Sequence, residues 1–439
     1  MKTTHNKRKI QKLAVLTGIT IVLACLSLSC GSRKENKLSL YINEYQKSYY
    51  KEGIEEFRET YPDVELELVT LGMTEPLSSV QKVKTEMMAG EGPDLLLFSS
   101  LGIDDVNKYM AAGAYAPLDE YMAADKEWDS DAYVSKVMEG GQFNGKQYVM
   151  PLNYSVQVIL SSREALEEAG FDIAACTDML SIMQQISALY ETDYKYQILA
   201  DCSMFIFFPQ QLKGEFMDYA TGKIGTDRKE LRAACDAYQN IFYEDNHADS
   251  LLDQGYYSQG TSILDRKAYI AAMSGGLTVS LQRIAAISAK ETPVLIPITK
   301  GDGKPIAQIR EYAGIRANSE NKENAWNMLR ILMSENMQTQ MAGAYNAAPV
   351  FKSAIDAQIQ ESIEEAVSDG AKEGVETGPI DEQLKEKYLD YLKNPGTAMF
   401  PNDLSRKFIE RMLPYLEGEG EYEDCLKEFE NYAGIYLTE

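Results

Sequence analysis

Strands and helices alternate along the first quarter of this chain, and that alternation constrains the fold more than any other feature. Apolar segments at 37–42 (KLSLYI), 64–69 (VELELV) and 94–98 (DLLLF) indicate strands, and the last is a continuous apolar run typical of a parallel strand covered on both faces. Between the first two, Ile54 and Phe57 recur at helical spacing. Such alternation predicts a mainly parallel, doubly wound α/β sheet.

The composition is that of a globular protein with a strongly acidic balance. The 439 residues are enough for two or three domains. Asp and Glu total 67 against 43 Lys and Arg, which gives a formal net charge of −24 at pH 7. Nucleic-acid binding needs a basic face that displaces counterions, and attraction to an anionic membrane needs the same sign of charge. The balance argues against both.

The first 29 residues have the organisation of an export signal. A basic segment without acids is followed by an apolar stretch, which ends abruptly at the polar GSRKEN. Cys30 lies where the apolar stretch ends, whereas Cys25 has the more usual aliphatic residue, Val22, three places before it. We expect a lipoprotein signal peptide over 1–29, lipidation of Cys30 (palmitate included), a tether over 30–37 and a membrane anchor. Lipidation of Cys25 and cleavage without lipidation stay open.

Histidine and cysteine usage narrows the possible chemistry. After the signal, His247 is the only histidine, which argues against histidine-cluster zinc sites and against Ser-His-Asp catalysis. Four further cysteines allow three disulfide pairings, and buried free thiols fit equally well. They are Cys176, Cys202, Cys235 and Cys425. We expect no metal and no cofactor.

Two later segments look like places where the chain passes from one sheet to another. In 146–160 (KQYVMPLNYSVQVIL), Pro151 interrupts an extended run and a second apolar strand follows. In 265–277 (DRKAYIAAMSGGL), an apolar run ends in glycines, and we expect a second crossing there. From Ser334 onward nearly everything has helical spacing.

Six segments together resemble the family 1, carbohydrate-type solute-binding proteins of ABC importers, and they occur in the order typical of that family. They are IEEFRETYPDVELEL, MMAGEGPDLLLF, GAYAPLDEYM, GKQYVMPLNYSVQVILSSREALEEAG, LDRKAYIAAMSGG and the block from Ala313 to Ser353. Each match alone is weak, whereas the ordered set is specific. Residues 171–260 and the tail beyond 355 match only in general character.

The resemblance implies a fold and a function that the residues alone do not establish. It implies a type II periplasmic-binding-protein-like fold, in which hinge strands join two doubly wound α/β lobes and the C-terminal lobe is rich in helices. We expect an N-terminal lobe from 38–150 and 278–310, and a C-terminal lobe from 155–273 and 315–439, with crossings near 150–156, 273–278 and 310–316. The lobes would close on a ligand by hinge motion. The resemblance implies a monomeric, extracytoplasmic lipoprotein that delivers a small-molecule ligand to ABC permease subunits. The ligand implied by the family is a sugar.

Ligands of open α/β sheets bind beyond the carboxyl ends of strands, which selects the candidate contacts. Carboxylates and amides would bond sugar hydroxyls, and tyrosine rings would stack on sugar faces. Tyr45 and Tyr154 also fit core positions. The candidates are Asn43, Glu44 and Tyr45 after the first strand; Ser99, Ser100 and Asp104 after DLLLF; Asn153, Tyr154 and Ser155 at the first crossing; and Gly275, Gly276 and Leu277 at the second.

The sequence departs from the sugar-binding pattern at two of these positions. Many members of the family have tryptophans where this chain has Ser99 and Leu277. A peptide, a polyamine or another polar solute therefore stays open as the ligand.

Two other functional classes remain to be distinguished. A secreted carbohydrate-active enzyme could hide a carboxylate pair among 67 acidic residues, but no GxSxG, P-loop, HExxH or EF-hand motif occurs. A structural or adhesive lipoprotein is the third class. We expect a binding protein and not an enzyme.

Overall fold

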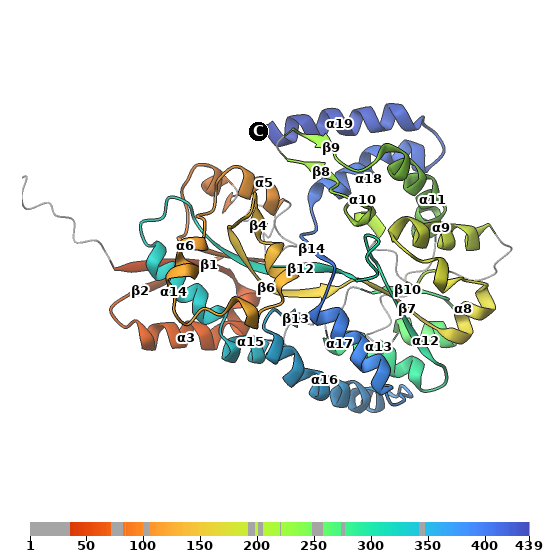
Figure 1. The fold of residues 1–439 in the computed structure, drawn as a ribbon, viewed down its shortest axis with the longest axis horizontal. Helices are drawn as coiled ribbons and strands as arrows, with labels where there is room; N and C mark the ends of the chain where they lie inside the picture. The colour runs from red at the N-terminus through yellow and green to blue at the C-terminus, as the bar shows by residue number, and fades with distance from the viewer. Residues whose placement is uncertain are drawn as a thin grey trace, which may run out of the picture.

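The computed structural model describes residues 36–71, 82–83, 85–99, 105–191, 198–200, 205–219, 221–247, 258–273, 277–341 and 347–438. These residues form two α/β lobes joined by long strands (Figure 1). The mixed α/β, two-lobed fold expected from the sequence is confirmed.

The first lobe is built on a seven-stranded sheet with the order β13-β6-β12-β3-β1-β2, in which β14 also pairs with β12. β1 is parallel to β2 and to β3, whereas β12 is antiparallel to β3 and β6. The predicted parallel arrangement thus holds for the first three strands. The strands are β1 (Lys37–Asn43), β2 (Glu65–Leu71), β3 (Leu95–Ser99), β6 (Val149–Val156), β12 (Ile306–Ile315), β13 (Ala348–Pro349) and β14 (Thr397–Met399).

Local sequence signals explain how helices follow these strands. Asn43 ends β1 and caps α2, because its side chain accepts from the backbone of Gln46 while the Gln46 side chain bonds back to Asn43. α3 buries Ile54 and Phe57, the pair with helical spacing in the sequence. The helices of this lobe are α2 (Glu44–Tyr49), α3 (Lys51–Thr60), α5 (Val106–Ala111), α6 (Asp119–Ala124), η1 (Ser130–Ala132), α7 (Ser135–Glu139), α14 (Lys322–Leu332) and α15 (Glu335–Met341), and a hairpin of β4 (Gln142–Phe143) and β5 (Lys146–Gln147) lies beside α7.

The second lobe has a three-stranded sheet surrounded by helices. Its central strand, β7 (Val158–Ser162), pairs antiparallel with β10 (Ala271–Met273) and β11 (Pro293–Pro297). Its other elements are α8 (Arg163–Ala169), η2 (Ile173–Ala175), α9 (Met179–Tyr190), η3 (Phe205–Phe207), α10 (Phe208–Gln211), β8 (Met217–Asp218), β9 (Lys223–Ile224), α11 (Arg228–His247), α12 (Ser258–Leu264), α13 (Leu277–Ser288), α16 (Lys352–Glu373), α17 (Glu382–Lys393), α18 (Asp403–Leu416) and α19 (Tyr422–Thr438).

The positions of the crossings correct the expected lobe boundaries. The chain leaves the first sheet after Val156, within the expected region. The second expected crossing, near 273–278, lies between β10 and α13, and both of these elements pack in the second lobe, as does β11. The chain returns through β12, and α14 then packs against α3 and β1 of the first lobe. Residues 278–305 therefore belong to the second lobe and 315–341 to the first. An apolar strand followed by glycines has the same sequence pattern whether the chain after it stays in the same lobe or crosses to the other lobe.

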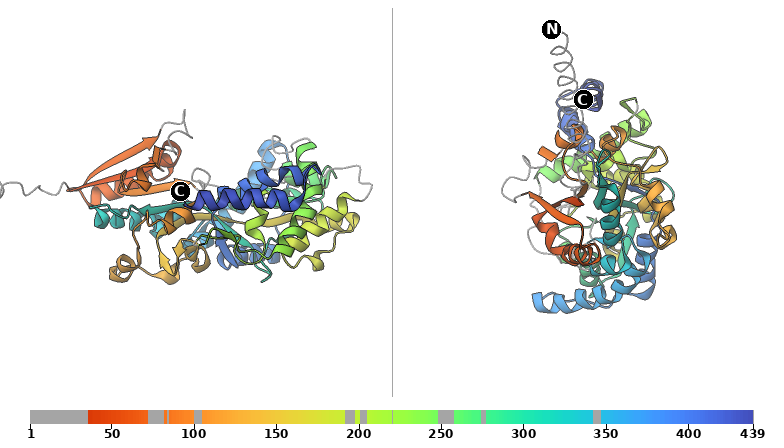
Figure 2. Two further views of the ribbon diagram at one scale, coloured as in Figure 1. Left: turned by 90° about the horizontal axis from the view of Figure 1, so that it is seen from above. Right: turned by 90° about the vertical axis from the view of Figure 1, so that its left-hand side faces the viewer.

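The two lobes also meet outside the hinge strands, as Figure 2 shows for the end of α19. The Lys108 ammonium on α5 donates to the backbone oxygen of Tyr436 at 2.6 Å and lies 4.0 Å from the centre of its ring. Among the described residues, Cys176, Cys235 and Cys425 are free thiols, and Cys202 lies outside them. No described helix is long and apolar enough to span a membrane.

Candidate functional site

A row of polar side chains crosses the first sheet where β3 ends. In the register of the strands, Glu311 of β12 lies opposite Ser99 on one side and opposite Asn153 of β6 on the other. Directly paired residues of neighbouring strands share a face of the sheet. Ser99, Glu311 and Asn153 therefore project from the same face at the carboxyl end of β3, which is where α/β sheets bind ligands.

A β-bulge at Arg310 turns Glu311 toward this face. Ile309 pairs with Tyr154, and Glu311 pairs with the neighbouring Asn153, so Arg310 is the extra residue on β12. Without the bulge, Ile309 and Glu311 would share a face, since alternate residues of a strand do. The bulge separates them and aims a carboxylate at α2.

Glu311 is only 2% exposed, and three hydrogen-bond donors hold its carboxylate. The Tyr50 hydroxyl donates to Oε2 at 2.6 Å and the Asn153 amide to the same oxygen at 2.9 Å. The Gln46 amide donates to Oε1 at 2.8 Å. A buried charge needs such partners, and an ionised carboxylate, which only accepts hydrogen bonds, suits all three. The cluster ties α2, β6 and β12 together.

The same face continues toward the second lobe with more buried polar groups. Asn153, Ser155 and Gln157 alternate along the chain and so face one way, and Gln308 pairs with Ser155. Arg310 Nε donates to Ser155 Oγ at 3.1 Å, and burial lowers the pKa of Arg310 from its ordinary value. Asn153 Oδ1, Gln157 Nε2 and Gln308 Oε1 are buried and have no hydrogen-bond partner in the described structure. An unpaired buried polar group costs free energy, so a polar solute that reaches these atoms when the lobes move apart would gain by pairing with them.

The sequence-predicted residues divide into three groups in the structure. The first group lies at or beside this polar row and consists of Asn43, Glu44, Ser99, Asn153 and Ser155. Glu44 is exposed in the first turn of α2, and its carboxylate lies 3.7 Å from the Lys47 ammonium. Ser100, Asp104, Gly275, Gly276 and Cys30 lie outside the described residues, as does the side chain of Tyr45.

Two of the predicted contact residues are buried in the hydrophobic core of this structure. Tyr154 faces away from the polar row because it alternates with Asn153 and Ser155; it is fully buried, and its hydroxyl donates to the backbone oxygen of Leu392. Leu277 is also fully buried at the start of α13. Both side chains belong to the hydrophobic core.

Sequence reasoning missed Glu311, the central residue of the row, and two of its three partners, Gln46 and Tyr50. Arg310 and Glu311 interrupt the otherwise apolar IAQIREYAGI strand, and two adjacent charges within a buried strand are a recognisable signal. Gln46 and Tyr50 stand four residues apart, which is the spacing of one helical face. In the part of the chain described, no group of three His, Cys, Asp or Glu residues is placed to hold a metal ion.

The lobes meet at a second place, where Asp105 caps α5. Its carboxylate accepts from the backbone N–H of Lys108 at 3.1 Å, and Asp105 is 1% exposed. Burial raises the pKa of Asp105 to about 7, although the Lys108 N–H and the Tyr219 hydroxyl of the second lobe favour its charged form. The contact therefore titrates near neutral pH.

Comparisons with known proteins agree with the two-lobed geometry. A family model described as bacterial extracellular solute-binding protein matches residues 42–339. The sugar-binding protein MalE from Xanthomonas citri has a similar structure, with a TM-score of 0.63, 14% identity, and 92% of this chain and 97% of that chain covered. No curated protein sequence matches significantly.

Two further structures show the same likeness. An ABC substrate-binding protein from Listeria monocytogenes, in complex with cycloalternan, has a TM-score of 0.55 at 14% identity, covering 92% of this chain and 99% of its own. A cyclic alpha-maltosyl-1,6-maltose binding protein from Arthrobacter globiformis has a TM-score of 0.56 at 13% identity, covering 91% and 98%. At such identities the structures establish the fold, and the family model, which spans more than half of the sequence, establishes membership. The chain belongs to the bacterial extracellular solute-binding protein family.

Proposed function

We propose that this chain is the membrane-anchored, extracytoplasmic solute-binding subunit of an ABC transporter. It captures a sugar or oligosaccharide between its two lobes and delivers it to the permease. Asn43, Glu44, Ser99, Asn153 and Ser155 contact the solute from the first lobe and the hinge. Family membership supports a solute-binding role outside the cytoplasm, and the named ligands of several structural neighbours motivate the choice of a sugar.

The observation that carries the proposal is the polar row centred on Glu311. A sugar hydroxyl both donates and accepts hydrogen bonds, so it can pair with the buried acceptors Asn153 Oδ1 and Gln308 Oε1 and with the donor Gln157 Nε2. The Glu311 network fixes the Asn153 amide, which leaves its oxygen in one orientation for the solute. A ligand that reaches β6 and β12 together with the second lobe would favour the closed arrangement of the lobes.

A thermal-shift screen tests the proposal on the chain from residue 31, which contains every described element. The panel contains mono- and oligosaccharides, peptides and polyamines, because binding to the native state raises the melting temperature. We expect a shift with at least one sugar. Shifts from peptides or polyamines alone would overturn the sugar assignment.

Titration calorimetry with the sugar that produces a shift then tests the site. Asn153→Ala and Gln308→Ala should each weaken binding about tenfold, the effect of losing one hydrogen bond worth roughly 1.4 kcal/mol. Glu59→Gln, on the exposed face of α3, is the matched control. Unchanged affinity in both site variants would remove the polar row from the binding site.

The anchor is tested in cells with an alkyne-labelled fatty acid. We expect the full-length chain to incorporate the label and to sediment with membranes, and Cys30→Ala to lose both properties. Cys25→Ala is the control, and loss of labelling in that variant instead would move the lipid to Cys25.

A further inference from the structure

A pocket lies on the opposite face of the hinge strands from the polar row. Gly140, at the end of α7, is so close to β12 that an added Cβ would stand 2.6 Å from Ile309 Cδ1 and 3.1 Å from Ala398 of β14. Ile309 pairs with Tyr154, which faces away from Asn153 and Ser155. α7 and the pocket beside it are therefore separated from the polar row by the sheet itself.

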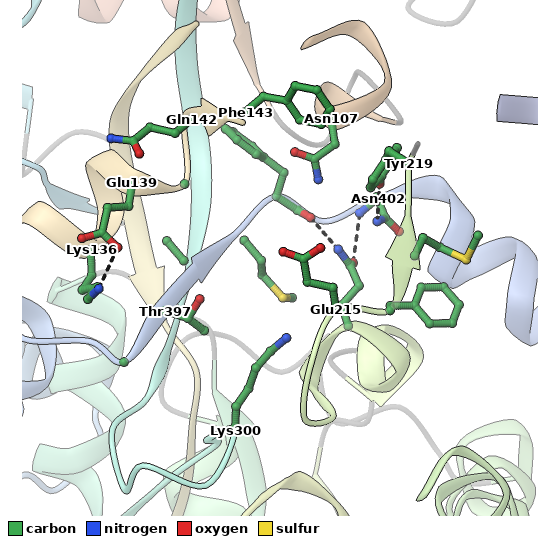
Figure 3. A pocket seen from close by; sticks show the side chains of 18 of the residues that line it. Asn107, Lys136, Glu139, Gln142, Phe143, Glu215, Tyr219, Lys300, Thr397 and Asn402 are labelled. Carbon is green, nitrogen blue, oxygen red and sulfur yellow. Dashed lines mark hydrogen bonds and ion pairs between the residues drawn. The ribbon is translucent and has the colours of Figure 1, made fainter. Parts of the chain in front are cut away.

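Both lobes line this back pocket, which has a volume of about 420 Å³. α5, α7, the β4–β5 hairpin and β14 contribute from the first lobe and its sheet, and the segment around β8 closes the other side together with Lys300. Figure 3 shows Glu215 and Lys300 reaching into the space from the second lobe, with Phe143, Asn107 and Gln142 along the opposite wall. The volume is within the range of small-molecule sites.

The charges that line the back pocket cancel. Lys136 and Glu139 form an ion pair of 2.7 Å at one side. Lys300 donates to the backbone oxygen of Gly214 at 2.6 Å, and burial lowers its pKa. With two lysines and two glutamates, Glu215 being the fourth, the lining has no net charge to attract a phosphate or a polyamine.

The uncharged part of the lining has the chemistry of a carbohydrate site. Asn107 and Gln142 supply amides, Thr397 a hydroxyl and Phe143 a half-buried aromatic ring, whereas the Asn402 amide is already bonded to the Tyr219 hydroxyl and to the backbone N–H of Ser405. Amides and carboxylates match neighbouring hydroxyl groups, and an aromatic ring packs on the apolar face of a pyranose. A wholly apolar ligand would desolvate the Gln142 amide and the Thr397 hydroxyl without offering them a hydrogen-bond partner, which is costly.

We propose that the back pocket is a second binding site, for a small neutral polyhydroxylated molecule such as a sugar or polyol. Because both lobes line it, a molecule bound there holds the lobes in the arrangement seen in this structure. Binding at the two sites is therefore coupled. A molecule in the back pocket changes the affinity of the polar row for its solute by a certain factor, and the solute changes the affinity of the back pocket by the same factor.

Fluorine NMR tests this site directly, with para-fluorophenylalanine in place of Phe143 in the chain from residue 31. Glucose, mannobiose and glycerol are titrated to about 50 mM, enough to reveal millimolar affinity, and glycine betaine and proline serve as zwitterionic probes. We expect a saturable change of the Phe143 resonance with at least one polyhydroxylated probe. In Glu215→Gln and Lys300→Met the half-saturation concentration should rise at least about threefold, the effect of one weakened hydrogen bond. Lys223→Met, on the exposed β9, should not change it.

The Asn153→Ala variant separates this site from the proposed function. A response that persists in Asn153→Ala and weakens in Glu215→Gln supports the back pocket, whether or not the polar row binds sugar. A response lost in Asn153→Ala and kept in both pocket variants reports lobe closure from the other face and overturns the proposal. No response to any polyhydroxylated probe, or a response to the zwitterions alone, overturns it as well.

Discussion

Replacing Glu311 by glutamine should destabilise the protein measurably, because the carboxylate is the acceptor of three buried donors. Whichever oxygen becomes an amide, its N–H groups face at least one existing donor: Gln46 on one side, or Tyr50 and Asn153 on the other. A hydrogen bond to a charged group contributes roughly 1.5–3 kcal/mol, and an unsatisfied buried donor costs about 1–3 kcal/mol. Part of this loss is offset because a neutral amide is easier to bury than a charge.

The expected net loss for Glu311→Gln is therefore about 2 kcal/mol in the free energy of unfolding. Domains are stable by about 5–15 kcal/mol, so the variant should still fold. Urea unfolding, followed by circular dichroism, measures the loss. The slope m of the unfolding free energy against urea concentration should be the same in both proteins, which checks that the transition is unchanged. The exposed Glu59→Gln should stay within about 0.5 kcal/mol of the wild type.

A double-mutant cycle with Tyr50→Phe sharpens this prediction. Tyr50→Phe removes the 2.6 Å hydrogen bond and Glu311→Gln removes at least its charge, so the combined effect should be at least about 0.5 kcal/mol smaller than the sum of the two. A Glu311→Gln variant as stable as the wild type, together with strictly additive effects, would refute the buried network.

Three further predictions concern the lobe contact, the hinge and the core. Because burial raises the pKa of Asp105 to about 7 while the unfolded value stays near 4, the folded state holds the extra proton between these values, and stability should fall as pH rises from about 4 to 7. Asp105→Asn keeps an N-cap acceptor and should flatten that slope in urea unfolding; an unchanged slope contradicts the assignment. Gly140→Ala should lower stability by about 1–3 kcal/mol because its Cβ meets Ile309, whereas Gly434→Ala on α19 has open space and should be neutral or stabilising; equal effects in thermal melts would speak against the close packing of α7. Tyr154→Phe should cost about 1 kcal/mol through its lost hydrogen bond and leave sugar affinity unchanged, and a large affinity loss in calorimetry would return Tyr154 to the binding site.

The sequence predicts those parts of the fold that depend on local pattern. The apolar run DLLLF became the buried parallel strand β3, and Asn43 and Ser99 could be placed at strand ends because carboxyl ends of parallel strands share an edge. Adjacent residues of one strand could not all face a ligand, however. Strand alternation separates Tyr154 from Asn153 and Ser155, and that distinction follows once the strand register is known.

The remaining features depend on tertiary structure that no local pattern encodes. The orientation of Glu311 results from a bulge at Arg310, whose position depends on pairing with β6. The back pocket joins α7, Glu215, Lys300 and β14, which are widely separated in the chain. The segment 273–278 resembled a crossing because an apolar strand before glycines has the same composition in either lobe.

Small-angle scattering with and without the sugar selected by the thermal-shift screen tests the central claim most directly. If the solute is captured between the lobes at the polar row, the radius of gyration should decrease on saturation, and Asn153→Ala should require a higher sugar concentration for the same decrease. A saturating sugar that leaves the radius of gyration unchanged, or one that compacts Asn153→Ala at the wild-type concentration, would contradict capture at this site.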